Sequence, residues 1–454
     1  MDPVTEALDD LHRRISPLKD GEVATYIPQL AHADPDDFGI ALTSMAGHRY
    51  QAGSADTPFS IQSVSKPFVY ALALTDLGPE EMLRRVGAEP SGEAFNAISL
   101  EEDTGRPANP MINAGAIATT ALVEAPDPAA RFARILDCLS AFAGRRLDHD
   151  EDVYASEAET GDRNRALAYL MRSAGSLEGD PHTVTDTYFR QCSVRVTAAD
   201  LAVMAATLAK GGLNPVTGAR VVTQDVAVRT LAIMATCGMY DGAGQWLLNV
   251  GLPAKSGVSG GLIAVSPGRF GVAIYSPPLD AEGNSVRGVV ALTAVSARFQ
   301  LHLMHAPVHL TATVTDTGTA ARSSRVRTPE QAAALDRDPR RITVVGAQGE
   351  LEFTETEQLL NAVAETAPGT PGAVVLDLTA VTGVSSGPAA MLAAALADLE
   401  EQGHRVAVAV QEPFLEQSEA RPGSWTGFST RDEALAWCED RFLDSPGLLN
   451  DASP

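Results

Sequence analysis

The sequence has little positive charge. Its 454 residues include 34 Lys and Arg against 58 Asp and Glu, which gives a formal net charge of -24. A surface this acidic is repelled by phosphate backbones and by anionic lipid, so we expect neither a nucleic acid nor a membrane as a partner. Small soluble molecules and other proteins are the ligand classes that remain.

Long apolar runs are also absent. No uninterrupted apolar stretch approaches the roughly 18 residues that cross a bilayer. The first residues, Met-Asp-Pro-Val-Thr-Glu, lack the basic and then apolar order of a signal peptide. These two observations predict a cytoplasmic protein.

Cysteine is rare, and its four positions contain no close pair: Cys138, Cys192, Cys237 and Cys438. This scatter argues against a disulfide framework and a thiolate metal site, and it favours buried free thiols. Among the histidines, only His302, His305 and His309 are closely spaced, and we interpret them as the exposed end of a helix that Pro307 breaks. We therefore expect no metal and no cofactor.

The chain is about three times as long as a typical domain of roughly 150 residues, and its pattern divides near residue 311. Within residues 1–311, strand-like hairpins at about 38–53 and 260–275 flank a mainly helical section, and a closing helix is expected at 290–305. A sheet assembled from both ends of this segment is the simplest arrangement. The first domain should therefore combine a sheet with inserted helices.

Residues 312–341 are rich in Arg and Thr and lack apolar periodicity, so they are expected to form a linker. From 342 to 454 strands alternate with helices, which indicates a small α/β domain. Thr354 with Glu357, and Thr430 with Glu433, have the spacing of capping boxes at the starts of two of these helices.

Lysine is the scarcer basic residue, with only four examples: Lys19, Lys66, Lys210 and Lys255. Arginine cannot act as a base, so a retained lysine in such a chain can mark a position that needs an amine able to lose its proton. Two of the four lysines lie in short motifs that suggest a reaction.

The first motif is Ser63-Val64-Ser65-Lys66, followed by Pro67. Proline is tolerated in an early helical turn, so a helix should begin near Ser63, and Ser63 and Lys66 then share one face. A desolvated lysine can take the proton of a serine hydroxyl, and the N–H groups of a helix start can stabilise an oxyanion. The motif therefore predicts a serine nucleophile with a lysine base.

The second motif is Lys255-Ser256-Gly257, placed just before a strand-like hairpin. On a strand, this triplet accompanies Ser-x-x-Lys in serine β-lactamases and penicillin-binding proteins. Both motifs occur together by chance on the order of once in a hundred such chains. A penicillin-interacting hydrolase remains an alternative, but those enzymes work outside the cytoplasm and use a Ser-x-Asn or Tyr-x-Asn element that is absent here.

Longer stretches point to a particular family. They are Tyr26–Leu30, Gln62–Lys66, Asn109–Ala116, Ser156–Glu157 with Gly161–Asn164, Asp186–Phe189, Cys237–Asp241 and Leu252–Val258. Over about residues 20–305 the chain resembles the serine-dependent glutaminases, a bacterial and mitochondrial kidney-type family. The resemblance implies a β-lactamase-like or transpeptidase-like catalytic domain, with an antiparallel sheet and a helical subdomain, and a homo-oligomer.

The same resemblance implies hydrolysis of L-glutamine to L-glutamate and ammonia through a γ-glutamyl ester. It implies that Ser63 is the nucleophile and Lys66 the general base. It also implies that Tyr26 and Tyr240 lie beside the reacting centre, and that the backbone N–H groups of Ser63 and Val258 form the oxyanion hole. The residues that would hold the amino-acid part of the substrate are Gln62, Asn113, Glu157, Asn164, Tyr188 and Tyr240. A carboxylate such as Glu157 suits the substrate ammonium, and amide and phenol donors suit its carboxylate.

Residues 341–445 resemble a STAS domain through Val374–Val381 and the following Ser385-Ser386-Gly387. In anti-sigma-factor antagonists, the first serine of an Asp-Ser-Ser-Gly stretch is phosphorylated at a helix N-terminus. Here Val384 replaces the aspartate and Pro388 follows the glycine. We therefore prefer a structural or protein-binding role for this α/β domain over phosphorylation of Ser385.

A non-catalytic protein that binds glutamine and switches partners is an alternative of a different class. The acidic surface is interpreted as an aid to solubility, because dense carboxylates could keep the protein dispersed and active in high salt.

Overall fold

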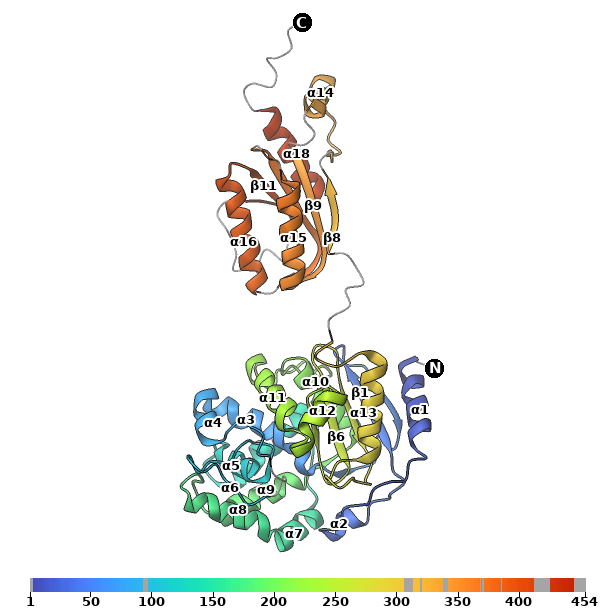
Figure 1. The fold of residues 1–454 in the computed structure, drawn as a ribbon, viewed down its shortest axis with the longest axis vertical. Coiled ribbons are helices and arrows are strands. Elements are labelled where there is room, and N and C mark those ends of the chain that lie inside the picture. Colours follow the sequence, from blue (N-terminus) through green and yellow to red (C-terminus); the bar gives the residue numbers. More distant parts are fainter. Residues whose placement is uncertain are drawn as a thin grey trace. The chain divides into compact units, whose positions relative to one another are not determined.

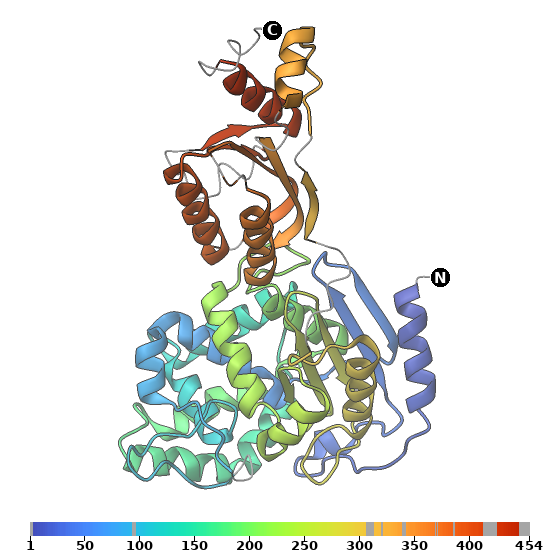
Figure 2. The same cartoon turned by 45° about the horizontal axis from the view of Figure 1, so that its top comes forward.

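The computed structural model describes residues 3–92, 97–305, 313–318, 321–337, 342–367, 369, 371–384, 386–411 and 425–444. The chain divides into two compact units, Met1–Ala306 and Pro307–Pro454 (Figure 1, Figure 2). Each unit has its own sheet and its own core, and each is described by itself.

The first unit contains an antiparallel five-stranded sheet in the order β2-β1-β7-β6-β5. Its strands are β1 (Gly39–Ser44), β2 (Arg49–Gly53), β5 (Ala254–Ser256), β6 (Gly261–Ser266) and β7 (Phe270–Tyr275). β1 and β7 pair in the centre, with Gly39 opposite Tyr275. The sheet therefore joins strands from both ends of the unit, as the sequence predicts.

Alternate side chains of these strands enter two different cores. Ile40, Val272 and Ile274 pack in one cluster with α1 (Pro3–Ile15), α12 (Ala243–Asn249) and α13 (Val286–Phe299). Ala41, Ile263 and Ala273 enter the other cluster, beside α10 (Ala198–Ala209). At Gly271 a Cβ would lie 2.1 Å from the backbone nitrogen of Ala206, so the close packing of α10 on β7 requires glycine there.

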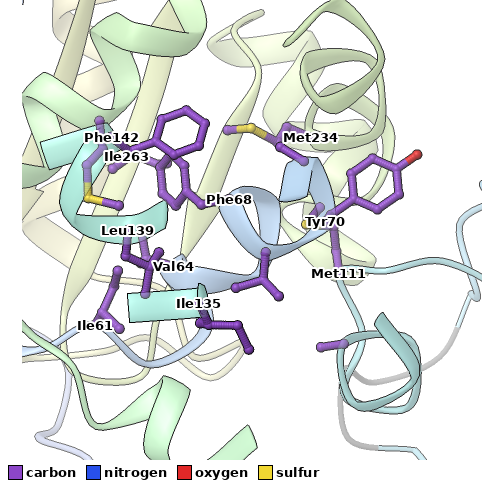
Figure 3. Close-up of a cluster of buried hydrophobic side chains, with 14 of the residues drawn as sticks. Ile61, Val64, Phe68, Tyr70, Met111, Ile135, Leu139, Phe142, Met234 and Ile263 are labelled. Carbon is purple, nitrogen blue, oxygen red and sulfur yellow. The ribbon is translucent and has the colours of Figure 1, made fainter. Parts of the chain in front are cut away.

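The remaining elements of this unit are mostly the helices of a second layer. They are α2 (Pro28–Ala31), α3 (Lys66–Leu77), α4 (Pro79–Arg85), α5 (Asn113–Leu122), α6 (Pro128–Ala143), α7 (Glu151–Thr160), α8 (Asp162–Ser173), α9 (Pro181–Cys192) and α11 (Gln224–Cys237), with the short strands β3 (Phe59–Ser60) and β4 (Arg195–Val196). Helix α3 lies in the middle of this layer, where Phe68 contacts Phe142 with ring centroids 4.9 Å apart (Figure 3). The helix that begins with Lys66 is therefore fixed by a dry core.

The closing helix differs from the expected 290–305. Helix α13 starts at Val286, because the Ser285 side chain accepts from the Gly288 N–H, and it ends at Phe299, because the C-cap residue Gln300 has a left-handed φ of 51°. His302 and His305 lie in the turn beyond it, and His309 lies outside the described residues.

The second unit has a sheet in the order β12-β11-β10-β9-β8, parallel from β9 to β12 and antiparallel between β8 and β9. The strands are β8 (Val314–Gly318), β9 (Ile342–Leu351), β10 (Ala373–Val384), β11 (Arg405–Ala409) and β12 (Thr426–Phe428). Helices α15 (Phe353–Thr366) and α16 (Ser386–Glu401) pack on one face, and α14 (Pro329–Arg337) and α18 (Arg431–Leu443) pack on the other (Figure 1).

The expected linker at 312–341 contains β8 and α14 of this unit. Between them, residues 321–328 are held on α18 by polar contacts rather than by apolar periodicity. Arg327 pairs with the buried carboxylate of Glu439 at 2.9 Å, and the Ser323 hydroxyl donates to the same carboxylate at 2.6 Å. Residues 321–328 are therefore held by contacts with the carboxylates of α18, and they need no apolar periodicity.

The capping box expected at Thr354 and Glu357 is wrong, and at Thr430 the side-chain cap of the N-terminus is present. Helix α15 begins at Phe353 and its N-cap residue, Glu352, makes no side-chain cap, whereas Thr430 caps α18 by accepting from the Glu433 N–H. Ser385 lies outside the described residues.

Candidate active site

Ser63 lies in a tight turn that leads into α3. Residues Gln62–Ser65 form a 3-10 turn, η1, which continues directly into α3 at Lys66. Ile61 is anchored by its N–H to the Val194 carbonyl at 2.8 Å, and Gln62 takes a left-handed φ of 48°. The expected helix start near Ser63 is thus a strained turn that places a largely buried serine, 8% exposed, ahead of the helix.

Lys66, the first residue of α3, is buried with only 1% of its surface exposed. Its Nζ donates to the Met111 carbonyl at 3.0 Å and to Oδ1 of Asn113 at 2.7 Å. Burial lowers the pKa of Lys66 to about 7, because the charged amine loses most of its hydration. A substantial part of the amine is therefore neutral near pH 7 and able to accept a proton.

Tyr240 connects the serine to two lysines. Its hydroxyl is hydrogen-bonded to that of Ser63, and burial raises the pKa of the Tyr240 phenol. Its ring centroid lies 5.5 Å from the Lys66 Nζ and 3.8 Å from the Lys255 Nζ. Burial, with the nearby Lys66 charge, holds the pKa of Lys255 well below its usual range. The site thus contains a neutral phenol between two buried amines.

A buried carboxylate forms a second group of contacts beside Gln62. Oε1 of Glu157 accepts from the Tyr26 hydroxyl at 2.8 Å and from Nε2 of Gln62 at 3.0 Å. Glu157 is 4% exposed, and its burial raises the pKa of the carboxyl against the opposing effect of these donors. Tyr26 as a residue is 49% exposed, so this group lies next to the protein surface.

The other expected residues surround these two groups. Nδ2 of Asn113 donates to Oδ1 of Asn164 at 3.0 Å, which extends the contacts of Lys66 to α8. Tyr188 is buried on α9 near Glu157 and Tyr240, and burial raises the pKa of its phenol well above the usual value. Val258 follows β5 and packs beside the small cluster that contains Ile27.

All ten expected site residues therefore lie in one region. Lys255 belongs to the second motif and is not among the expected site residues, although its contact with the Tyr240 ring places it in the site. The scarcity of lysine and the Lys-Ser-Gly triplet were the signals available for it. Across the described ranges of the chain, no group of three His, Cys, Asp or Glu side chains is arranged to hold a metal ion.

Comparison with known proteins identifies the family. The glutaminase family model matches residues 21–304, which include every residue of this site, and the model described as "Mlab, STAS domain" matches residues 334–418. Glutaminase 2 of Bradyrhizobium diazoefficiens is 43% identical over 458 residues, covering 99% of this chain and 73% of that protein. The chain belongs to the glutaminase family.

Solved structures of glutaminase relatives agree with both units. The crystal structure of Mglu is 41% identical, with a TM-score of 0.78, and covers 91% of this glutaminase and 100% of that chain. Mglu in its glutamate form is 38% identical with a TM-score of 0.80, covering 91% and 100%. The expected multidomain α/β fold and the C-terminal STAS domain are confirmed. Among the described residues of this glutaminase, no helix combines the length and apolarity that a membrane crossing requires.

Proposed function

We propose that this glutaminase hydrolyses L-glutamine to L-glutamate and ammonia through an ester between the substrate γ-carbon and Ser63. The observation that carries the proposal is Lys66, a buried amine with a pKa of about 7, three residues from the serine and held by Met111 and Asn113. Such an amine can take a proton at neutral pH and return it within one catalytic cycle.

The first half of the reaction forms the ester. The neutral amine of Lys66 removes the Ser63 proton while Oγ attacks the side-chain amide carbon, and the N–H groups of Ser63 and Val258 stabilise the resulting oxyanion. The C–N bond then breaks, and the proton held by Lys66 passes to the leaving nitrogen. Tyr240 supports this transfer because its hydroxyl is hydrogen-bonded to that of Ser63 and its ring lies beside the amines of Lys66 and Lys255.

In the second half, water attacks the ester and Lys66 again acts first as a base and then as an acid. Lys66 takes a proton from water, the water oxygen attacks the ester carbon, and the C–O bond to Ser63 breaks as the proton returns to Oγ. Glutamate is released with Ser63 and Lys66 in their starting states. That a relative was crystallised in a glutamate form supports binding of this product.

Substrate orientation is assigned to the surrounding polar side chains. The carboxylate of Glu157 would pair with the substrate ammonium, because it is buried and already oriented by Tyr26 and Gln62. The other side chains proposed to hold the amino-acid part of the substrate are Gln62, Asn113, Asn164, Tyr188 and Tyr240.

Ammonia release by Ser63→Ala and Lys66→Ala tests the mechanism. We expect both variants to lose activity, with Lys210→Ala as a matched control because the Lys210 amine donates to the Met45 carbonyl at 2.7 Å, at the end of α10. Mass spectrometry of wild type quenched during turnover should find a glutamyl group on Ser63. Full activity in either alanine variant would contradict the mechanism, and tight glutamine binding without ammonia release would favour the non-catalytic alternative.

The C-terminal domain is assigned a structural or protein-binding role, and the enzyme is proposed to be a homo-oligomer. A chain ending at residue 311 tests both statements. Unchanged turnover with altered subunit number would place the domain in assembly, whereas an unchanged subunit number would exclude it from assembly.

A further inference from the structure

Three buried polar side chains form a chain of hydrogen bonds behind Ser63. Nε2 of Gln191 on α9 donates to the Ser65 hydroxyl at 3.0 Å, and Oε1 of Gln191 accepts from the Thr120 hydroxyl of α5 at 2.8 Å. Ser65, Gln191 and Thr120 are each at most 1% exposed. None of them is among the residues assigned to the substrate or to the reaction.

This chain of hydrogen bonds ends on Gln62, the strained residue of the turn. The Ser65 hydroxyl donates to the carbonyl oxygen of Gln62 at 2.8 Å, and Gln62 is the residue with the left-handed φ of 48°. A non-glycine residue keeps such a conformation only where its surroundings fix it. Gln62 directly precedes Ser63, so a relaxation of its backbone would move the serine.

Burial makes each bond in the chain hard to replace. Water cannot reach Ser65 or Gln191 to substitute for a lost partner, so removal of one hydroxyl leaves the next polar group unsatisfied. The chain of hydrogen bonds also joins three elements, η1, α9 and α5, which carry Ser63, Tyr188 and Asn113 respectively. It therefore links the turn to the helices that complete the site.

We propose that Ser65, Gln191 and Thr120 are positioning residues, which hold the Gln62 backbone in its left-handed conformation and thereby aim the Ser63 hydroxyl at the substrate. This inference rests on the proposed role of Ser63 as nucleophile. The three side chains act only through the turn, and they take no part in binding or proton transfer.

Thr120→Val is the main test, because valine keeps the shape of threonine and removes its hydroxyl at the far end of the chain. Thr230→Val is the matched control: Thr230 is also fully buried and donates to the carbonyl four residues earlier, at 2.8 Å against 2.9 Å for Thr120, but its helix, α11, carries no assigned site residue. Ammonia release and thermal unfolding are measured for the full chain.

We expect Thr120→Val to lower kcat by about tenfold or more, since a displacement of about 1 Å costs up to roughly a hundredfold. Thr230→Val should lose less than about twofold in kcat, because it removes a buried hydroxyl that bonds a carbonyl of its own helix and leaves the turn untouched. Thr120→Val also leaves Oε1 of Gln191 without its hydroxyl donor, so its thermal stability should fall further than that of Thr230→Val. Thr120→Ser should restore kcat, and the pH dependence of kcat/KM should stay unchanged because Lys66 keeps its surroundings. Equal kcat in the two valine variants, or a displaced pH profile, would overturn the inference.

A double-mutant cycle tests whether the chain acts as one unit. Once Ser65→Ala has broken the link to Gln62, Thr120→Val should cost little further kcat, whereas additive losses would refute a shared action. The proposed function has its own separate test: full activity in Ser63→Ala would refute that function and, with it, the positioning role. An inactive Ser63→Ala with equal valine variants would refute only the positioning role.

Discussion

Replacing Lys66 by methionine should abolish catalysis and make the protein more stable at neutral pH. An exposed lysine with a pKa near 10.5 is neutral in about one molecule in 3,000 at pH 7, whereas a pKa of about 7 leaves about half of the amine neutral. Keeping this amine buried opposes folding, because the unfolded chain would bind the proton more tightly. The methionine side chain removes that cost and cannot act as a base.

The size of the effect follows from the two pKa values. The folded pKa of Lys66, about 7, lies below the unfolded value near 10.5, so the unfolded chain holds more protons between these pH values and stability must rise with pH. At pH 7 the burial costs about 4 kcal/mol, from about 1.36 kcal/mol for each pKa unit. Lys66→Met also removes the donor to Met111 and Asn113, and the two acceptors left unpaired destabilise the variant by about 1–3 kcal/mol. The net result is that Lys66→Met should be about 1–3 kcal/mol more stable than wild type at pH 7.

The assay compares urea unfolding of wild type and Lys66→Met at pH 7 and pH 9, followed by circular dichroism. From pH 7 to pH 9, wild type should gain about 2 kcal/mol relative to the variant, because groups common to both proteins cancel in the difference, except for Lys255, whose pKa also responds to Lys66. The kcat/KM of wild type should fall below about pH 7 as the same amine becomes protonated. Parallel stability profiles, or a kcat/KM without this acid limb, would refute the reasoning.

Three further predictions address other parts of the chain. Glu157→Gln should raise KM by about tenfold or more while changing kcat less, because it removes the charge assigned to the substrate ammonium; steady-state ammonia release checks this, and an unchanged KM would contradict the assignment. Arg327→Met should destabilise the second unit by about 3 kcal/mol, because it leaves the buried Glu439 carboxylate without the positive charge of Arg327. Thermal unfolding measures that change, and turnover should be unaffected. Activity should persist in molar NaCl, given the net charge of -24, and a loss equal to that of a less acidic relative would argue against this role of the acidic surface.

The motifs predict the proposed reacting groups because serine and lysine three residues apart have a local geometric meaning. Ser63 and Lys66 lie on one short turn and the helix that follows it, so spacing alone indicates their proximity. The partners that control their chemistry come from distant segments. Gln191 lies 126 residues beyond Ser65, and nothing local to either residue indicates the bond between them.

The same limit explains the misassigned linker. Residues 321–328 have no apolar periodicity, and periodicity was the signal by which the sequence could be divided. Their structure depends on carboxylates of α18, with Ser323 and Glu439 separated by 116 residues. Helix starts were predictable where a side chain caps the backbone, as Thr430 does, and not at Phe353, where none does.

The central pairing of β1 with β7 has a consequence for how the enzyme is made. β1 leaves the ribosome about 240 residues before its partner, as the pairing of Gly39 with Tyr275 requires. At about 5–20 residues per second, the delay is roughly 10–50 seconds, during which the edge of the β1–β2 hairpin is open to other chains. The complete sheet can therefore form only when synthesis of the first unit is nearly finished. Slowed translation in the helical section should thus increase aggregation of nascent chains, although the finished enzyme would be unchanged.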